Sequence, residues 1–321
     1  MKESSFNGKI LIFLICVFFL TITIEPICLA STGVLLMVKG KVNIKSHGAV
    51  SPARSGLRLN PGTTVYSLKG TATILVSDGE IYNVGKGSNF TLREGEERFD
   101  EDSLFVKLMD TIREIANRGR GQFFKSTKKD EKEISLVYPF NSFINFNRIQ
   151  FEWVPLKEIR ETEVILKSPS PAYKYSFIIK SEKNKVVFPK EAPPLVPGTR
   201  YYWRVKGYEG AKLEPYISKL CWFSVLDMKK SEQLEADMKK IDKIKGLGPE
   251  DKEFLRANLF ILYGLYHNAV GIFQKSFKKF PGDAGIKELL TGLLIKMKNF
   301  EEAEKLIDRE PEEGFHSEQE Y

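Results

Sequence analysis

Apolar residues recur at two different spacings along the chain. In residues 33–92 and again in 149–226 they alternate with polar residues at every second position, which predicts strands with one buried face. In residues 104–115 and 231–307 they recur every three or four positions, which predicts helices. We therefore expect a multidomain chain, mainly β with α, in which two β segments are separated by a helical connector and followed by a helical tail.

The first β segment is divided by short turn pairs. Asp78-Gly79 is one of several pairs that end in glycine, which tolerates the positive φ of tight hairpins. Each strand between these turns is expected to bury one face. The expected inward-facing residues are Val34, Leu36 and Val38, then Val42 and Ile44, and then Ala72, Ile74 and Val76.

This segment resembles the FecR domain family of bacterial envelope proteins. The family motifs G-x-V, G-x-x-L-x-x-G-T-x-V and a-x-l-x-x-x-D-G are matched by Gly40-Lys41-Val42, by residues 56–65 and by residues 72–79. The resemblance implies a small FecR-like β domain over residues 31–97. The best-known members pass a signal from an outer-membrane transporter to a cytoplasmic sigma factor. Only nine residues precede the first apolar run, so we expect no cytoplasmic domain and no sigma-factor control.

The N-terminus has the pattern of a secretory leader. Residues 10–24 are apolar or threonine, a run shorter than the roughly 20 residues of a bilayer span. Cys28-Leu29-Ala30 places small residues three and one before a cleavage point, so residues 1–30 are predicted to be a signal peptide that is removed after Ala30. The protein is then exported to the periplasm or cell envelope. The alternative is an uncleaved membrane anchor, and we expect contact with a membrane only in that case.

Charge is distributed unevenly over the 321 residues, whose formal net charge is +7. Residues 31–77 hold six Lys or Arg and no acid, whereas residues 299–321 hold nine acids. A basic surface attracts anionic polymers. We therefore expect the first β domain to bind a glycan or another anionic polymer, and the candidate residues are Lys39, Lys41, Lys45, Arg54 and Arg58.

Residues 98–133 are predicted to be a helical connector and a basic linker. Asp102 or Ser103 can cap a helix whose apolar positions include Leu108 and Ile112, and Gly119 is expected to end it. The basic stretch 118–132 is interpreted as a solvated linker that touches anionic glycan or lipid. Nucleic acid is not an expected partner, because an exported chain rarely meets it.

Residues 134–227 are predicted to form an immunoglobulin or fibronectin III-like β-sandwich, because six or seven short strands occur in about ninety residues. Residues 195–205, Leu-Val-Pro-Gly-Thr-Arg-Tyr-Tyr-Trp-Arg-Val, resemble the fibronectin type III motif L-x-P-G-T-x-Y-x-W-x-V. This resemblance places Tyr201 at the tyrosine corner, with its ring in the core and its hydroxyl bonded to nearby backbone. Trp153, Trp203 and Trp222 are expected in the core rather than on an exposed sugar-binding platform.

Residues 228–310 are predicted to be a pair of helical repeats. Tyr266 and Ala269 recur as Phe300 and Ala303, each 34 residues later, which resembles the tetratricopeptide period. Two repeats are fewer than a stable solenoid requires. We therefore expect them to pack against helix 231–244, against the sandwich or against a partner. Residues 311–321 are expected to be an acidic, flexible tail. The candidate residues for binding an envelope protein are Phe260, Tyr263, Tyr266 and Phe273; the alternative is a structural cap without a partner.

No set of side chains predicts a reaction. The histidines, His47, His267 and His316, are far apart in the sequence, and none belongs to a metal-binding motif. Cys221 is the single cysteine beyond the leader, and its apolar neighbours predict a buried, inert thiol. We therefore predict no catalytic residue, cofactor or metal. The predicted function is that of a non-enzymatic binding and assembly scaffold; the alternative is a periplasmic ligand sensor that keeps its N-terminal anchor.

Overall fold

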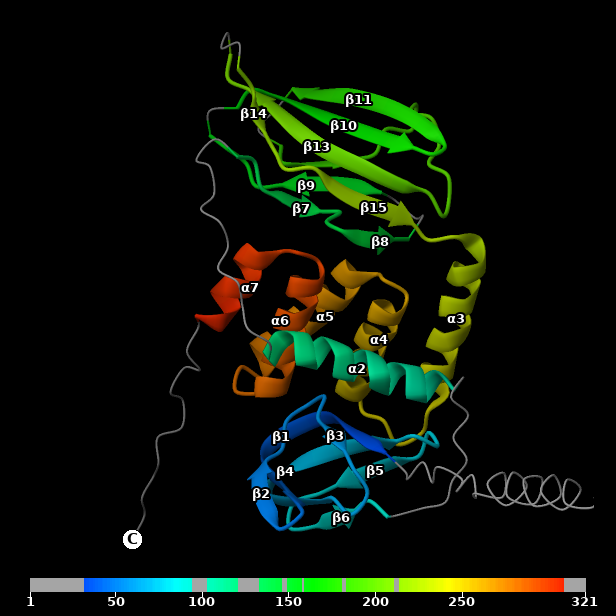
Figure 1. Ribbon diagram of the computed structural model, residues 1–321, viewed down its shortest axis with the longest axis vertical. Helices are drawn as coiled ribbons and strands as arrows, with labels where there is room; N and C mark the ends of the chain where they lie inside the picture. Colours follow the sequence, from blue (N-terminus) through cyan, green and yellow to red (C-terminus); the bar gives the residue numbers. More distant parts are fainter. Residues whose placement is uncertain are drawn as a thin grey trace, which may run out of the picture.

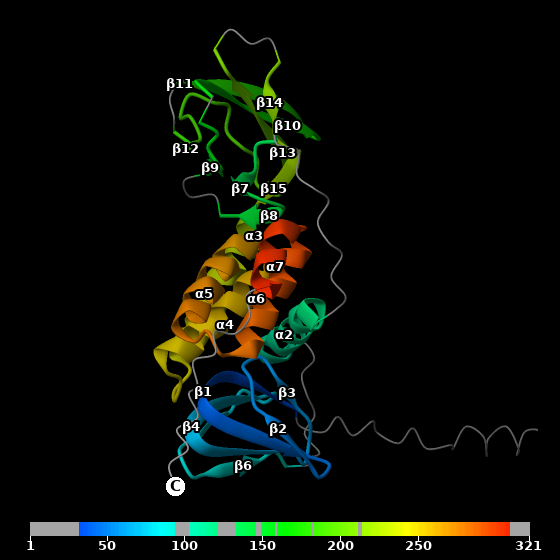
Figure 2. The same cartoon turned by 90° about the vertical axis from the view of Figure 1, so that its left-hand side faces the viewer.

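The computed structural model describes residues 32–93, 103–120, 133–145, 149–157, 159–180, 183–210 and 214–308. The predicted signal peptide, most of the predicted basic linker and the predicted acidic tail lie outside these residues. The fold is mixed, with mostly antiparallel sheets and, within the described ranges, six helices. Figures 1 and 2 show three layers: a β-sandwich at one end, the helices in the middle and a second β unit at the other end.

The N-terminal β unit, residues 32–93, is built around two long antiparallel strands. The strand order is β2-β1-β4-β5, with β3 paired to β1 and β6 paired to β4. Gly40 lies opposite Gly70 in the ladder, and a Cβ on Gly40 would lie 2.5 Å from the backbone oxygen of Lys69, so this crossing requires glycine. The strands are β1 (Gly33–Ser46), β2 (Ala49–Pro52), β3 (Arg58–Leu59), β4 (Thr64–Val76), β5 (Ile81–Val84) and β6 (Asn89–Thr91).

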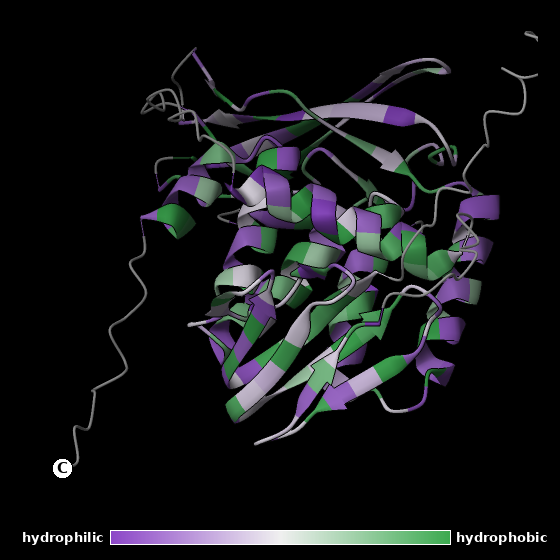
Figure 3. Cartoon of the chain, turned by 60° about the horizontal axis from the view of Figure 1, so that its bottom comes forward, coloured by the Kyte–Doolittle hydropathy of each residue, from purple (hydrophilic) through white to green (hydrophobic). Residues whose placement is uncertain are grey.

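The expectation that each strand buries only one face is wrong for β1 and β4. Leu35 and Ile74 point into the core of the β unit itself, whereas Leu36 and Leu75 pack into a second core beneath the helices. Residues 33–38 of β1 are all buried. Figure 3 shows hydrophobic residues both in these strands and in the helices that cover them. The outer face is buried because the helical layer lies on it.

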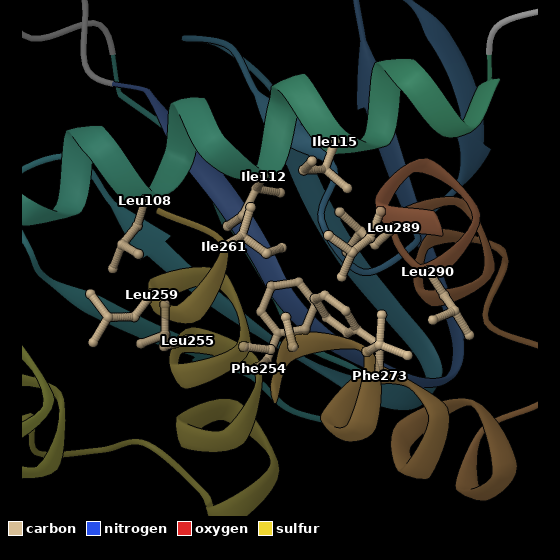
Figure 4. Close-up of a cluster of buried hydrophobic side chains, with 14 of the residues drawn as sticks. Leu108, Ile112, Ile115, Phe254, Leu255, Leu259, Ile261, Phe273, Leu289 and Leu290 are labelled. Carbon is tan, nitrogen blue, oxygen red and sulfur yellow. The ribbon is translucent and has the colours of Figure 1, made fainter. Parts of the chain in front are cut away.

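The helical layer consists of α2 to α7. Figure 4 shows Leu108, Ile112 and Ile115 of α2 pointing toward residues of α4, α5 and α6, with the strands of the N-terminal β unit behind them. These side chains belong to one core that also includes Leu36 and Leu75 of the β unit. The helices are α2 (Leu104–Arg120), α3 (Met228–Lys243), α4 (Pro249–Leu262), α5 (Tyr266–Lys279), α6 (Ala284–Lys296) and α7 (Phe300–Ile307).

Helix α2 is an integral part of this layer rather than a connector. Gly119 does not end it, since the helix continues to Arg120. Its role is close packing instead: a Cβ on Gly119 would lie 2.0 Å from the backbone oxygen of Glu288, and a Cβ on Gly292 would lie 2.0 Å from that of Ile115. Helix α2 therefore supplies the surface against which α4, of the α4–α5 hairpin, and α6, of the α6–α7 hairpin, pack.

The sandwich, residues 133–227, has one sheet ordered β11-β10-β13-β15-β8, with β14 on β13, and a second ordered β12-β9-β7. Its core is a separate aromatic cluster that includes Phe151, Trp203 and Phe223. The strands are β7 (Leu136–Tyr138), β8 (Ser142–Ile144), β9 (Gln150–Trp153), β10 (Glu161–Pro169), β11 (Ala172–Lys180), β12 (Lys185–Val187), β13 (Arg200–Tyr208), β14 (Tyr216–Ile217) and β15 (Cys221–Val225).

The geometry predicted for Tyr201 is present in the sandwich. Its ring is buried, and its hydroxyl accepts a hydrogen bond from the Val196 amide at 2.8 Å. Trp153 and Trp203 are core residues, as expected. Trp222 is only partly buried, and the Arg200 guanidinium lies over its ring at 4.3 Å from the centroid. Two of the three tryptophans are thus excluded from any exposed platform.

Candidate functional site

A cleft of about 600 Å³, open to solvent, lies where the helical layer meets the sandwich. Its lining comes from four parts of the chain: the start of α2, one face of α3, the turn between α4 and α5, and strand β8. A volume of this size lies within the range of small-molecule sites. The lining residues are Leu104, Lys107, Phe143, Lys230, Gln233, Asp237, Lys240, Leu262, Tyr263, Gly264 and Tyr266.

Helix α3 forms one wall of the cleft. It begins after Asp227, whose carboxylate caps the helix by accepting from the Lys230 amide at 2.9 Å. The lining residues of α3 follow one another at spacings of three, four and three, so they form a single polar stripe. Leu234 and Ile241 lie on an adjacent stripe and pack into the helical core. The wall therefore has a fixed orientation toward the cleft.

Asp237 organises the polar side chains of this wall. It is only 4% exposed and accepts hydrogen bonds from Tyr263 Oη at 2.8 Å, Lys240 Nζ at 2.8 Å and Gln233 Nε2 at 3.2 Å. Burial alone raises the pKa of Asp237, but these hydrogen bonds outweigh burial and lower the pKa overall. Asp237 is therefore ionised and compensated by Lys240, and it holds Gln233 and Tyr263 in place.

The cleft has an excess of positive charge. Its lining contains three lysines but only one carboxylate. The Lys230 ammonium lies 5.6 Å from the centroid of the Phe143 ring and 3.7 Å from the carboxylate of Asp227. Lys107 contributes a second cation from α2, on a different wall of the cleft. Lys230 and Lys240 are thus each paired with a carboxylate of this chain, so the count of lining charges alone does not favour an anionic ligand.

Phe143 and the turn at Gly264 form the floor of the cleft. Gly264 has φ +76°, and a Cβ there would lie 2.7 Å from the Phe143 ring, so this contact requires glycine. The Phe143 amide donates to the Gly264 oxygen at 2.9 Å, and the Tyr266 amide donates to Ser142 Oγ at 3.0 Å. One backbone hydrogen bond and one to a side-chain hydroxyl thus fix the sandwich against the α4–α5 turn.

His267 secures the same junction from the first turn of α5. Its Nε2 accepts from the Phe140 amide at 2.7 Å, and its ring meets Tyr138 edge to face with 4.9 Å between centroids. Burial lowers the pKa of His267 to about 4. The imidazole is therefore neutral at physiological pH, which Nε2 requires in order to accept a hydrogen bond.

The four predicted partner-binding residues are not all available to a partner. Tyr263 and Tyr266 line the cleft. Phe260 is partly buried against the helical core. Phe273 is 0% exposed and packs edge to face on Phe254, with 5.8 Å between ring centroids. The assignment of Phe273 to a partner surface is therefore corrected: its ring fills the core of the α4–α5 hairpin.

Two of the five predicted anion-binding residues bind carboxylates of the helical layer instead. Arg54 Nη1 lies 2.6 Å from Glu288, and Lys39 Nζ lies 3.4 Å from Glu250. Glu250 also pairs with Lys279, and these cations, together with backbone hydrogen bonding, lower its pKa to about 2. Arg54 and Lys39 therefore help to hold the N-terminal β unit on the helices, and their binding of an anionic polymer stays a prediction.

The other three predicted anion-binding residues, Lys41, Lys45 and Arg58, are exposed, but none of them lines the cleft. Lys41 lies directly opposite Lys69 in the β1–β4 ladder. The N-terminal β unit thus contains a pair of like charges, and this unit lies at the opposite end of the molecule from the sandwich (Figure 1).

The sequence missed the polar wall and the floor of the cleft. The spacing of Lys230, Gln233, Asp237 and Lys240 places all four on one helix face, and a charged stripe on an otherwise solvated helix was the available signal. No sequence pattern links Phe143, in the sandwich segment, to Gly264 more than a hundred residues later.

The remaining reactive groups do not converge. Cys221 is buried, and burial raises the pKa of its thiol to about 12, which agrees with the expected inert cysteine. Across the described ranges, no group of three or more His, Cys, Asp or Glu residues is placed to hold a metal ion. Of the helices described, none combines the length and apolar character needed to cross a bilayer.

Comparison with known proteins gives similarity only at the level of solved structures. No protein-family model matches the chain, and no curated protein is similar to it. A two-domain fibronectin type III segment of chicken tenascin is 11% identical, with a TM-score of 0.20, over 60% of this chain and 81% of that one.

Two further solved structures show a similar degree of likeness. The chicken CNTN1 FN1–FN3 domains are 10% identical, with a TM-score of 0.21, over 60% of this chain and 57% of that one. A beta-1,2-glucanase from Parabacteroides distasonis is 13% identical, with a TM-score of 0.24, over 86% of this chain and 48% of that one. This chain thus spans only about half of the last two. TM-scores at this level assign neither a family nor an activity.

Proposed function

We propose that this protein is a non-enzymatic scaffold of the bacterial cell envelope, exported by its N-terminal leader, that binds a partner in the cleft between the helical layer and the sandwich. The finer assignments belong to this proposal: a FecR-like N-terminal β unit, a fibronectin type III-like sandwich and a tetratricopeptide-like helical tail. The observation that carries it is the cleft itself, whose walls come from parts of the chain that are distant in sequence.

The packing supports a presenting role. Helix α2, the C-terminal hairpins and the outer face of β1 share one core, and the sandwich is bonded to the α4–α5 turn through Phe143 and Ser142. A cleft whose walls are already in place loses little conformational entropy when a ligand binds. The two β units then serve to fix the helices and to extend the surface around the cleft.

Site-specific photo-crosslinking in cells that export the full chain tests this proposal. A photoreactive residue replaces Leu262, which is 38% exposed and lines the cleft, or Ile217, which is 40% exposed on β14 and does not. We expect one defined adduct from position 262 and none from position 217. Equal adducts from both positions, or none from 262, would contradict the proposal. So would steady turnover of a substrate by the purified chain that is abolished by a single side-chain substitution.

A further inference from the structure

The N-terminal β unit has a basic strip on the outer face of its sheet, separate from the cleft. Val38 and Val42 of β1 point into the core of the unit, so the alternation of strand residues places Lys41 and Lys45 on the outer face. Lys69 of β4 lies directly opposite Lys41 and therefore shares that face. All three lysines are exposed, and together they define the basic strip.

The basic strip is not compensated by this chain. Among the residues that the structure describes, none with a carboxylate pairs with Lys41, Lys45 or Lys69. Lys39, two residues before Lys41 and closer to the helices, is by contrast paired with Glu250. Strands β1, β2 and β4 contain no acid. Since like charges directly opposite each other destabilise a sheet, an anion bound here would relieve an unfavourable arrangement.

The sandwich has a lysine pair of the same kind in a different electrostatic setting. Lys167 of β10 lies directly opposite Lys174 of β11. Glu161 and Glu163 lie on the same face of β10 as Lys167, because they precede it at even spacings in a regular ladder. Charges of both signs are therefore mixed on that face, whereas the basic strip presents one sign alone.

Groups that suit a hydroxyl-rich ligand lie between the lysines of the basic strip. Asn43 follows Lys41 and precedes Lys45 on the same face, and it lies directly opposite Tyr66 of β4. Asn89 of β6 lies opposite Tyr66 on its other side. Side-chain amides both donate and accept hydrogen bonds, and a partly buried aromatic ring offers a flat apolar surface to the C–H face of a sugar. The strip thus combines cations with the groups that contact sugars.

The spacing of the charges favours a polymer. A strand rises about 3.4 Å per residue, so Lys41 and Lys45 are separated by about 13 Å along β1, more than the length of one sugar ring. Val50 and Leu68, which are 57% and 48% exposed, lie beside Lys45 and Lys69 and would suit a lipid surface. The amides and the tyrosine ring between the lysines favour a glycan over a lipid surface.

We propose that the basic strip binds an acidic polysaccharide, with its three lysines at the carboxylates or sulfates of the polymer and Tyr66 against a sugar ring. The site adds Lys69 and Tyr66 to the residues expected from the sequence and does not use Lys39 or Arg54, which pair with carboxylates of the helices. It goes beyond the proposed function, because it is a second site at the other end of the molecule from the sandwich (Figure 1). A scaffold with both sites holds a partner in its cleft while it is attached to a glycan.

Calorimetric titration of the purified full chain tests this proposal. Polygalacturonate oligomers and dextran sulfate are the two anionic probes, which carry carboxylates and sulfates respectively. Neutral dextran, a poly-glutamate peptide and phosphatidylglycerol vesicles are the comparisons. We expect saturable binding of one or both anionic glycans, and the tighter one identifies the preferred group. This binding should weaken as the salt concentration rises, because salt screens exposed charges.

The variants separate the basic strip from net charge and from folding. Lys69→Gln should weaken glycan binding by up to about fivefold, the size of one exposed ion pair, and Lys69→Gln combined with Lys41→Gln by about tenfold. Lys174→Gln is the matched control, since it also removes one lysine from a cross-strand lysine pair, and we expect unchanged binding. Tyr66→Leu should weaken the glycans several-fold without changing any binding of poly-glutamate. Thermal melting checks that each variant is folded.

Several outcomes would overturn the inference. Equal loss in Lys69→Gln and Lys174→Gln would show that binding follows the net charge and not the basic strip. Binding of dextran, poly-glutamate or the vesicles as tight as that of the anionic glycans would contradict recognition of an acidic polysaccharide. Absence of binding by both anionic glycans would refute it outright. The crosslink at position 262 does not depend on any of these results, so the proposed function stands or fails separately.

Discussion

The contact between α2 and α6 gives the sharpest prediction about how the helical layer is held together. At Gly292, an added Cβ would lie 2.0 Å from the Ile115 carbonyl oxygen and 2.8 Å from the Gly119 amide nitrogen. Ordinary van der Waals contact begins near 3.4 Å, so the two helix backbones would have to separate by roughly 1.4 Å at this point. The obstacle is backbone, which cannot rotate away as a side chain can.

The free energy of unfolding of Gly292→Ala follows from two opposing effects. Replacing glycine by alanine within a helix stabilises the helix by about 1 kcal/mol. Overpacking against a rigid neighbour costs about 1–3 kcal/mol, and the upper end applies because separating the helices also loosens Ile112 and Ile115 from Leu289. We expect Gly292→Ala to be destabilised by about 2 kcal/mol.

Gly271→Ala is the matched control. It makes the same chemical change in the interior of α5, where an added Cβ meets no atom within 4 Å. This variant should therefore be stabilised by about 0.5–1 kcal/mol. Urea denaturation followed by circular dichroism measures both variants under the same conditions. If Gly292→Ala were as stable as Gly271→Ala, the close approach of α2 to α6 would be refuted.

Three further predictions concern single side chains. The pKa of His267 is about 4 in the folded chain, below its ordinary value of 6.5. The unfolded state therefore takes up a proton first as the pH falls. The free energy of unfolding should drop by up to about 3 kcal/mol between pH 6.5 and pH 4. Denaturation at several pH values should show this loss in the parent chain and a smaller one in His267→Gln, and an identical profile in both would count against the neutral histidine. Tyr201→Phe leaves the Val196 amide without its acceptor and should cost about 1–2 kcal/mol in urea, whereas no loss would argue against this hydrogen bond. Cys221 should react with a thiol reagent only under denaturing conditions, because it is 3% exposed and burial raises its pKa to about 12; rapid labelling of the native chain would disprove its burial.

Local patterns in the sequence predicted local structure well. The apolar spacing of α2 placed Leu108, Ile112 and Ile115 on its buried face. The motif around Tyr201 predicted both the buried ring and the hydrogen bond of its hydroxyl. Ala269 and Ala303, which share the 34-residue spacing, are both fully buried. Each of these depends on residues that are close in sequence or on one face of one element.

Features that depend on the meeting of distant segments were not predicted. Residues 33–38 are six consecutive apolar residues, which is the pattern of a strand buried on both faces, but the helices that bury the second face lie far along the chain. Gly119 has the sequence context of a helix end, yet it serves close packing with α6. The cleft requires α2, α3 and β8 at once, so no single pattern could indicate it.

The central claim is that the two β units are held by the helices in one fixed arrangement, so that the cleft exists before any ligand binds. Pulsed electron spin resonance between spin labels at Val50 of β2 and Ile178 of β11 measures this most directly, because both residues are exposed and lie in opposite end layers. The labels are attached to cysteines introduced at these positions in a chain whose Cys16 and Cys28 are replaced by serine, and Cys221 is shielded by burial. The account predicts a single narrow distance distribution that does not change with ligand. A broad or multiple distribution would contradict it.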